Sequence, residues 1–286
     1  MSVDEVNQNR LPPGLRKAAV RVPAVTVAFW ITKGLTTGMG ESSSDYLVHR
    51  LPPVVAVALG GTALVAALIL QFAARRYVPW IYWLAVAMVG VFGTMAADVL
   101  HVGLGVPYLV STAFFAVTLA VVFAAWYASE KTLSIHSIFS ARREAFYWAA
   151  VMATFALGTA AGDMTAVTLN LGYFASGVMF VVVVAIPAIA HRWFGLNAIL
   201  AFWFAYVATR PLGASFADWM GVSHARRGLD LGAGTVSLAL AVLIVGFVVY
   251  MSLHHGAQRV AGDQGAHEVQ ERRRESRSKT THRTGT

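Results

Sequence analysis

The sequence contains no cysteine and has few charged residues for its length. The absence of cysteine from all 286 residues excludes disulfide bonds, thiolate metal sites and cysteine nucleophiles. Charged residues make up 13% of the chain, compared with roughly 25% in an ordinary soluble domain, and hydrophobic residues make up 57%. Much of the surface must therefore face something other than water, which predicts an integral membrane protein.

The net charge of +8 does not indicate nucleic-acid binding, because the positive residues are placed as in membrane proteins. Most of them lie in short segments between apolar runs or near the end of the chain. Six lie in the last fifteen residues, namely Arg272, Arg273, Arg274, Arg277, Lys279 and Arg283. The expected partners are the lipid bilayer and a metal ion or proton, with no nucleic acid, and a homo-oligomer is compatible with the sequence.

Eight stretches are long enough to cross a bilayer, which takes about 20 apolar residues. Four of them carry no charge: 54–73, 106–129, 164–190 and 231–254. Four others carry charges and alternate with the first set: 23–47, 79–101, 145–163 and 196–220. The pattern predicts an all-α, polytopic transmembrane bundle of eight helices.

The same pattern predicts the domain organisation and the orientation. The predicted segments are an N-terminal arm at 1–22, four helices at 23–130, a linker at 131–144, four helices at 145–255 and a disordered basic tail at 256–286. The arm lacks the apolar segment of a signal peptide. Arginine and lysine concentrate in the arm, the linker, the tail and the loops on the same side, so both termini are expected in the cytoplasm and the helices in the plasma membrane.

The charged stretches share one motif, which is an aromatic residue, Trp, nine residues, Gly, four residues and Asp. The Trp residues are Trp30, Trp83, Trp148 and Trp203; the Gly residues are Gly40, Gly93, Gly158 and Gly213; the Asp residues are Asp45, Asp98, Asp163 and Asp218. Fixed spacing in four copies indicates internal repeats. Each repeat has two helices, so the repeats are predicted to run parallel, with the motif helices as an inner bundle.

Helical rise places the motif residues along the bundle. Trp to Gly is about 15 Å and Trp to Asp about 22 Å. The Trp residues are expected as anchors at the cytoplasmic interface, the Gly residues near the middle of the membrane, and the Asp residues in its outer part. Packing between helices is the favoured role for the Gly residues. The alternative for each Asp is that it caps the next helix or lies in solvent.

The motif helices hold an excess of acidic residues. Glu41 and the four Asp residues are five negative residues, whereas only two residues of these helices, Lys33 and Arg210, are positive. Each ionisable group within a membrane costs about 2.5–3.5 kcal/mol, so some carboxyls are protonated or a cation is bound. Carboxylates, hydroxyls, and carbonyls freed where Gly40 or Pro211 breaks a helix are hard ligands, suited to Mg²⁺, Ca²⁺ or Mn²⁺. His101, if a ligand and not a loop residue, favours Mn²⁺ or Fe²⁺.

These motifs resemble a bacterial family of uncharacterised membrane-anchored proteins built from a repeat of unknown function. The similar segments lie between about residues 20 and 255 and include Thr36-Thr37-Gly38-Met39-Gly40-Glu41, Leu157-Gly-Thr-Ala-Ala-Gly-Asp163 and Thr209-Arg-Pro-Leu-Gly-Ala-Ser-Phe-Ala-Asp218. The second repeat is the loosest match. The resemblance implies a link with tolerance to manganese and other metals, and hence an exporter.

The leading hypothesis is a cation transporter, not an enzyme, that exports a divalent metal such as Mn²⁺ and has no resident cofactor. The predicted metal or proton ligands are Asp45, Asp98, Asp163, Asp218 and Glu41, with Arg210 and Lys33 as counter-charges. Proton antiport is a natural mechanism, because a carboxyl in low dielectric takes up a proton more readily than one in water. The alternatives are an Asp-dependent intramembrane hydrolase, a transporter of small organic cations and a membrane scaffold without transport.

Overall fold

The computed structural model describes residues 20–74 and 76–254. Most of the predicted arm and nearly all of the predicted tail lie outside these residues. The long α-helices are α3 (Val27–Arg50), α4 (Pro53–Ala73), α5 (Pro79–Asp98), α6 (Tyr108–Glu130), α7 (Ala141–Asp163), α8 (Tyr173–Phe194), α9 (Ala198–Gly221) and a last one, Ala233–His254, which we call the closing helix. Short π-helical turns, Val99–Gly103 and Met164–Thr168, extend α5 and α7.

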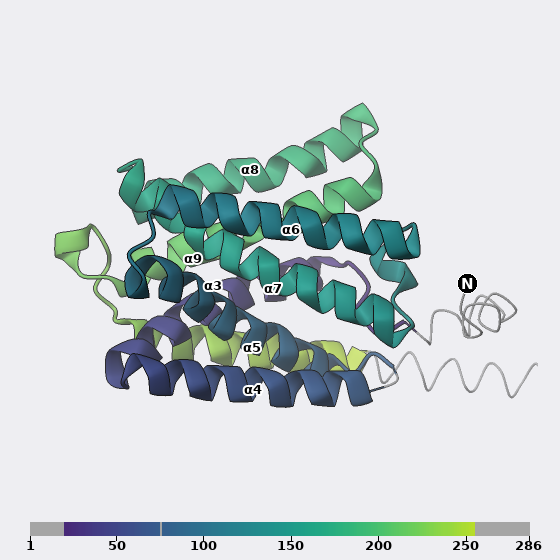
Figure 1. The fold of residues 1–286 in the computed structure, drawn as a ribbon, viewed down its shortest axis with the longest axis horizontal. Helices are drawn as coiled ribbons and strands as arrows, with labels where there is room; N and C mark the ends of the chain where they lie inside the picture. The colour runs from purple at the N-terminus through teal and green to yellow at the C-terminus, as the bar shows by residue number, and fades with distance from the viewer. Residues whose placement is uncertain (1–19, 75, 255–286) are drawn as a thin grey trace, which may run out of the picture.

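The structure confirms the predicted all-α, polytopic membrane protein. Within the described residues there are eight long helices and no strand. Seven of the helices are long and apolar enough to cross a membrane. The remaining one, α3, has 24 residues and contains Lys33, Glu41 and Asp45, which lower its hydropathy. The helices lie side by side along one direction (Figure 1).

The four motif helices form a closed inner ring. Helix α3 packs against α5 and α9, and α7 packs against the same two helices from the other side. In the most apolar windows of α5, α7 and α9, 50–67% of residues are buried inside the protein, whereas the figure is 11–28% for α4, α6, α8 and the closing helix. The predicted inner bundle with charge-free helices outside is therefore confirmed.

Each outer helix covers the inner helix of the next repeat. Helix α4 packs mainly on α5, α6 on α7 and α8 on α9. The closing helix returns to the first repeat, where Ser237 hydrogen-bonds to Ser43 at 2.6 Å and Ile244 packs on Met39. The ring is therefore interlocked, and the fourth repeat completes the packing around the first.

The motif glycines explain how the inner helices approach so closely. Counting from the motif Trp, the glycine at position +10 of each helix lies against position +7 of the next helix in the ring. A Cβ added to any of these glycines would lie 2.6–2.8 Å from the residue opposite. The pairs are Gly40 with the backbone of Gly90, Gly93 with the Cβ of Phe155, Gly158 with the Cβ of Arg210, and Gly213 with the Cβ of Thr37. The same contact recurs at all four interfaces, as expected for small residues between membrane helices.

Three sequence predictions about helix ends and breaks are wrong. Helix α7 begins at Ala141, four residues before the predicted start, because the side chain of Ser140 accepts a hydrogen bond from the amide of Arg143 and caps the helix. Residues 164–168 extend α7 and do not begin the next helix. Helices α3 and α9 also run unbroken through Gly40 and Pro211, so the predicted breaks are not present.

Adding a methyl group where two helix backbones meet, at Gly40 and Gly90, should destabilise the protein. Gly40→Ala places a carbon 2.8 Å from the backbone of Gly90, and overpacking of this kind costs typically about 1–3 kcal/mol. Gly34→Ala on the same helix is the matched control, because a Cβ there has no neighbour within 4 Å and alanine favours a helix interior by about 0.5–1 kcal/mol. Thermal unfolding in detergent should show a lower Tm for Gly40→Ala only. Equal shifts would contradict the ring contact.

Candidate functional site

The four motif aspartates line one cavity, together with Glu41. The cavity has a volume of about 480 Å³ and lies at the end of the inner ring where the Asp residues are, which we call the Asp end; the opposite end is the Trp end. The alternative in which each Asp caps the next helix is not observed for the first three repeats. Helices α4, α6 and α8 are preceded by Pro52, Pro107 and Gly172.

Within this cavity, Asp98, His101 and Asp163 come close enough to share a metal ion. One ligand atom from each lies within 4.8 Å of the others. His101 Nε2 is 3.1 Å from Asp98 Oδ1 and 3.5 Å from Asp163 Oδ2. Two carboxylate oxygens and an imidazole nitrogen form a mixed donor set that suits Mn²⁺ or Fe²⁺ better than Mg²⁺ or Ca²⁺.

The π-helical turns explain this arrangement. His101 lies in the turn Val99–Gly103, which continues α5 directly after Asp98. Of the two alternatives for His101, the loop residue is therefore not observed, and its side chain is only 2% exposed. Asp163 is likewise followed by a π-helical turn. Such turns often occur at functional sites, and here the turn places His101 between the two aspartates.

A second cavity adjoins the first on the side of α3, α9 and the closing helix. Its volume is about 850 Å³, and Asp45 and Asp218 line both cavities. Arg226 also lines both cavities and donates a hydrogen bond to the hydroxyl of Tyr173 at 2.5 Å. Sequence spacing does not point to Arg226, because it lies in a loop far along the chain from the motif residues it faces.

Deeper in the ring, Arg210 and Glu41 form a buried ion pair on the axis. Arg210 Nη2 lies 2.7 Å from Glu41 Oε2, and the two side chains are 0% and 5% exposed. The same nitrogen also hydrogen-bonds to the hydroxyls of Thr94 and Thr159, and Nη1 donates to the carbonyl of Thr37 at 3.1 Å. Both threonine hydroxyls in turn donate to Glu41 at 3.2 Å. All four inner helices contribute to this network, which we call the axial network.

The second predicted counter-charge, Lys33, lies elsewhere. Its side chain is fully buried, and Nζ lies 4.1 Å from the ring centre of Phe155 and 4.2 Å from that of Tyr206. Among the described residues, it makes no ion pair and Nζ has no hydrogen-bond acceptor. Arg210 therefore pairs with Glu41, whereas Lys33 neither pairs with a carboxylate among the described residues nor extends to the surface.

Aromatic side chains fill the ring at the Trp end. Trp83, Trp148 and Trp203 are 1–4% exposed and belong to the core, so the prediction that they anchor the protein at the lipid interface is wrong. The indole of Trp203 donates to the carbonyl of Leu133 at 2.9 Å. The hydroxyls of Tyr82 and Tyr147, one residue before their motif Trp, lie 2.5 Å apart. The packed rings of Tyr82, Tyr147 and Trp203 belong to one hydrophobic core cluster.

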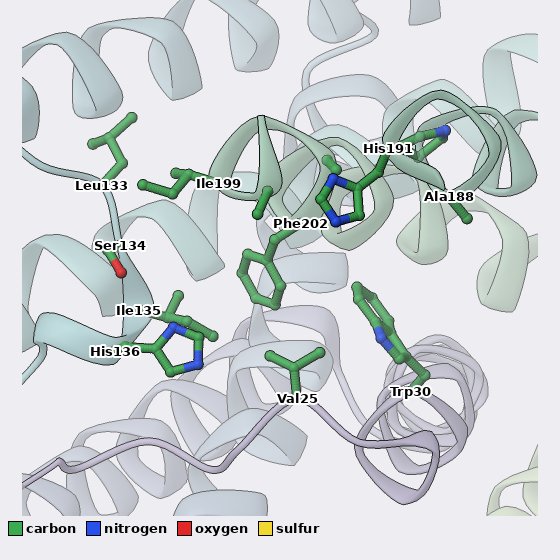
Figure 2. A pocket seen from close by; sticks show the side chains of 13 residues that line it. Val25, Trp30, Leu133, Ser134, Ile135, His136, Ala188, His191, Ile199 and Phe202 are labelled. Carbon is green, nitrogen blue, oxygen red and sulfur yellow. The ribbon is translucent and has the colours of Figure 1, made fainter. Parts of the chain in front are cut away.

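A separate pocket at the Trp end lies to the side of this core. It has a volume of about 350 Å³ and is lined by α3, α8, α9 and the segment 133–136. Figure 2 shows His136 and His191 at opposite sides of the pocket, with Phe202 between them and Trp30 on the same side as His191. No carboxylate lines it, so it lacks the ligands of a divalent metal site and differs from the Asp-end cavities.

Four segments of the chain match one family, described as a repeat of unknown function (DUF347). The matched residues are 28–77, 81–132, 146–196 and 201–256, which make up more than half of the chain. The chain belongs to this family. Each DUF347 match contains one inner and one outer helix, so the two-helix repeat predicted from the motif is confirmed. No curated protein and no solved structure matches the chain.

Removing one partner of the buried ion pair should destabilise the protein strongly. Arg210→Met leaves Glu41 without its counter-charge, which costs about 3–5 kcal/mol in buried pairs. Adding Glu41→Gln should restore part of that loss, because the unpaired charge is then removed. Unfolding in mixed detergent micelles measures both variants together with Glu41→Gln alone. If the losses of the two single variants simply add in the double variant, the two side chains are not coupled.

Proposed function

We propose that this protein is a divalent-metal transporter of the bacterial inner membrane, and that it exports Mn²⁺ or a closely similar ion. The observation that supports this proposal most is the convergence of four repeat aspartates and Glu41 on one cavity at the end of a membrane-spanning ring. Carboxylates within a membrane are costly in free energy, so they more often belong to ion or proton pathways than to contacts that stabilise the fold. We further propose that the chain is not an enzyme.

The metal would be held by Asp98, His101 and Asp163, whose ligand atoms lie within 4.8 Å of one another. Asp45 and Asp218 line the same cavity and add negative potential that attracts a cation to the site. Glu41 is occupied by Arg210 in this structure, so its carboxylate becomes available only if the ion pair opens.

The axial network would act as the barrier between the two sides of the membrane. It joins all four inner helices at the level below the cavity, and the aromatic core fills the ring beyond it. A metal ion that crosses must therefore separate Arg210 from Glu41. Rearrangement of the repeats against one another would open the barrier, as in other transporters built from repeats.

Metal flux in proteoliposomes tests the proposal. The purified protein is tested with Mn²⁺, Fe²⁺, Mg²⁺ and Ca²⁺ on both sides of the vesicle, and Mn²⁺ is expected to move fastest. Asp98→Asn and Asp163→Asn each remove an anionic ligand, so Mn²⁺ affinity should fall by more than the roughly 10–100-fold typical of changes to residues that only support ligands. Binding is measured by Mn²⁺ electron paramagnetic resonance.

Asp230→Asn is the matched control, because Asp230 has a side chain that is 56% exposed and lies outside the cavities. It should keep wild-type affinity and flux. His101→Gln should reduce the preference for Mn²⁺ over Mg²⁺, because an amide oxygen replaces the imidazole nitrogen. Absence of both Mn²⁺ binding and flux in the wild type would refute the metal proposal.

A further inference from the structure

Polar side chains follow the axis of the ring from one end to the other. Counted from the motif Trp, they occur every four residues, which is about 6 Å of helix rise. Tyr82 and Tyr147 are at position −1, Lys33 and Tyr206 at +3, Arg210 and Thr37 at +7, Glu41, Thr94 and Thr159 at +11, and the four aspartates at +15. An apolar ring would pack without them, so this column requires a functional explanation.

Among the residues of this column, Lys33 has the surroundings that stabilise its charged form least. Its amine is fully buried and, within the part of the chain that the structure describes, lacks a hydrogen-bond acceptor and a carboxylate partner. Contacts with the faces of Phe155 and Tyr206 stabilise the ammonium, but by less than burial of an unpaired ion destabilises it. The site therefore stabilises the charged form of the amine less than water does.

The groups around Lys33 do not supply a counter-charge. From α9 it faces Tyr206, and Arg210 contacts the same Phe155 ring with its Cζ 5.0 Å from the ring centre. From α7 and α5, Tyr147 and Tyr82 lie about one helical turn toward the Trp end, and their hydroxyls hydrogen-bond to each other. On its own helix, Glu41 is two turns away and is paired with Arg210. Lys33 is therefore repelled by one cation and attracted by no free anion.

We propose that Lys33 is a proton-binding site and that its proton is exchanged for the metal ion, which makes the protein a metal–proton antiporter. The inference rests on the proposed transport function and assigns its coupling residue. In the exchange, an N–H bond of the ammonium breaks, the electron pair stays on the amine, and the proton passes to water that enters the ring from the Trp end when the repeats rearrange.

Electrostatic repulsion couples the two ions. A divalent ion that passes the opened axial network comes within a few helix turns of Lys33, in surroundings of low effective dielectric where like charges repel strongly. The ammonium and the metal therefore exclude each other from the axis. When the metal enters, the proton leaves, and when a proton returns to the amine the metal cannot re-enter. Neither a carboxylate nor an aromatic residue at position 33 would produce this exclusion.

The test compares Mn²⁺ accumulation in proteoliposomes with and without a pH gradient, at clamped membrane potential, for the wild type, Lys33→Met and Lys33→Arg. Each exchanged proton should change the equilibrium accumulation ratio about tenfold per pH unit, since one unit corresponds to 1.36 kcal/mol. Lys33→Met, similar in shape but uncharged, should still bind Mn²⁺ and lose this tenfold effect. Lys33→Arg keeps a permanent charge on the axis, so it should bind Mn²⁺ but transport it at least about tenfold more slowly.

Lys131→Met, at an exposed position after α6, is the matched control and should keep the full pH effect. Mn²⁺ binding at the Asp end reports that each variant is folded. Lys33→Met that binds Mn²⁺ and retains the tenfold effect would show that Lys33 only fills the core. If wild-type Mn²⁺ flux does not depend on the pH gradient, the inference about Lys33 is wrong, but the proposed metal transport is not contradicted. If the wild type shows no Mn²⁺ flux, the proposed function itself is refuted.

Discussion

The ion pair between Arg210 and Glu41 is the interaction on which the rest of the ring depends. A guanidinium buried in a membrane protein must have its hydrogen-bond donors satisfied, because unpaired buried charges are costly. Glu41, Thr94, Thr159 and the carbonyl of Thr37 supply acceptors for the two terminal nitrogens of Arg210, and they come from three different helices. This requirement fixes the relative height of those helices around α9. It also explains the absence of a side chain at Gly158, which lies directly against the stem of Arg210.

Charge changes sign along the axis in an ordered way. Carboxylates line the cavity at the Asp end, the two buried cations lie in the middle, and aromatic rings fill the Trp end. A cation is therefore attracted at one end and stopped a short distance further in. In this order of layers, a carboxylate-lined cavity ends at the axial network, and one lysine and one arginine lie on the axis.

Regular spacing explains which features the sequence could predict. The Trp, Gly and Asp residues recur at fixed intervals, so the eight helices, the inner ring and the shared height of the aspartates followed from periodicity alone. Contacts between repeats could not be predicted, because the spacing within one helix does not show which of its faces packs against which neighbouring helix. The burial of Trp83, the position of His101 between two aspartates, and the separation of Lys33 from Glu41 all depend on such contacts. The π-helical turn after Asp98 has no sequence signature comparable to a proline or a glycine.

The interlocked ring has the arrangement that four separate two-helix subunits would adopt around a fourfold axis, with each subunit covering its neighbour. Four identical subunits, however, would place four copies of each side chain around that axis. At position +7 they would bring four arginines together, and at +11 four glutamates. A single chain escapes this constraint: Thr37, Gly90, Phe155 and Arg210 occupy equivalent places with different chemistry. Fusion of the repeats is thus what allows one arginine to meet one glutamate at the centre of an otherwise symmetric assembly.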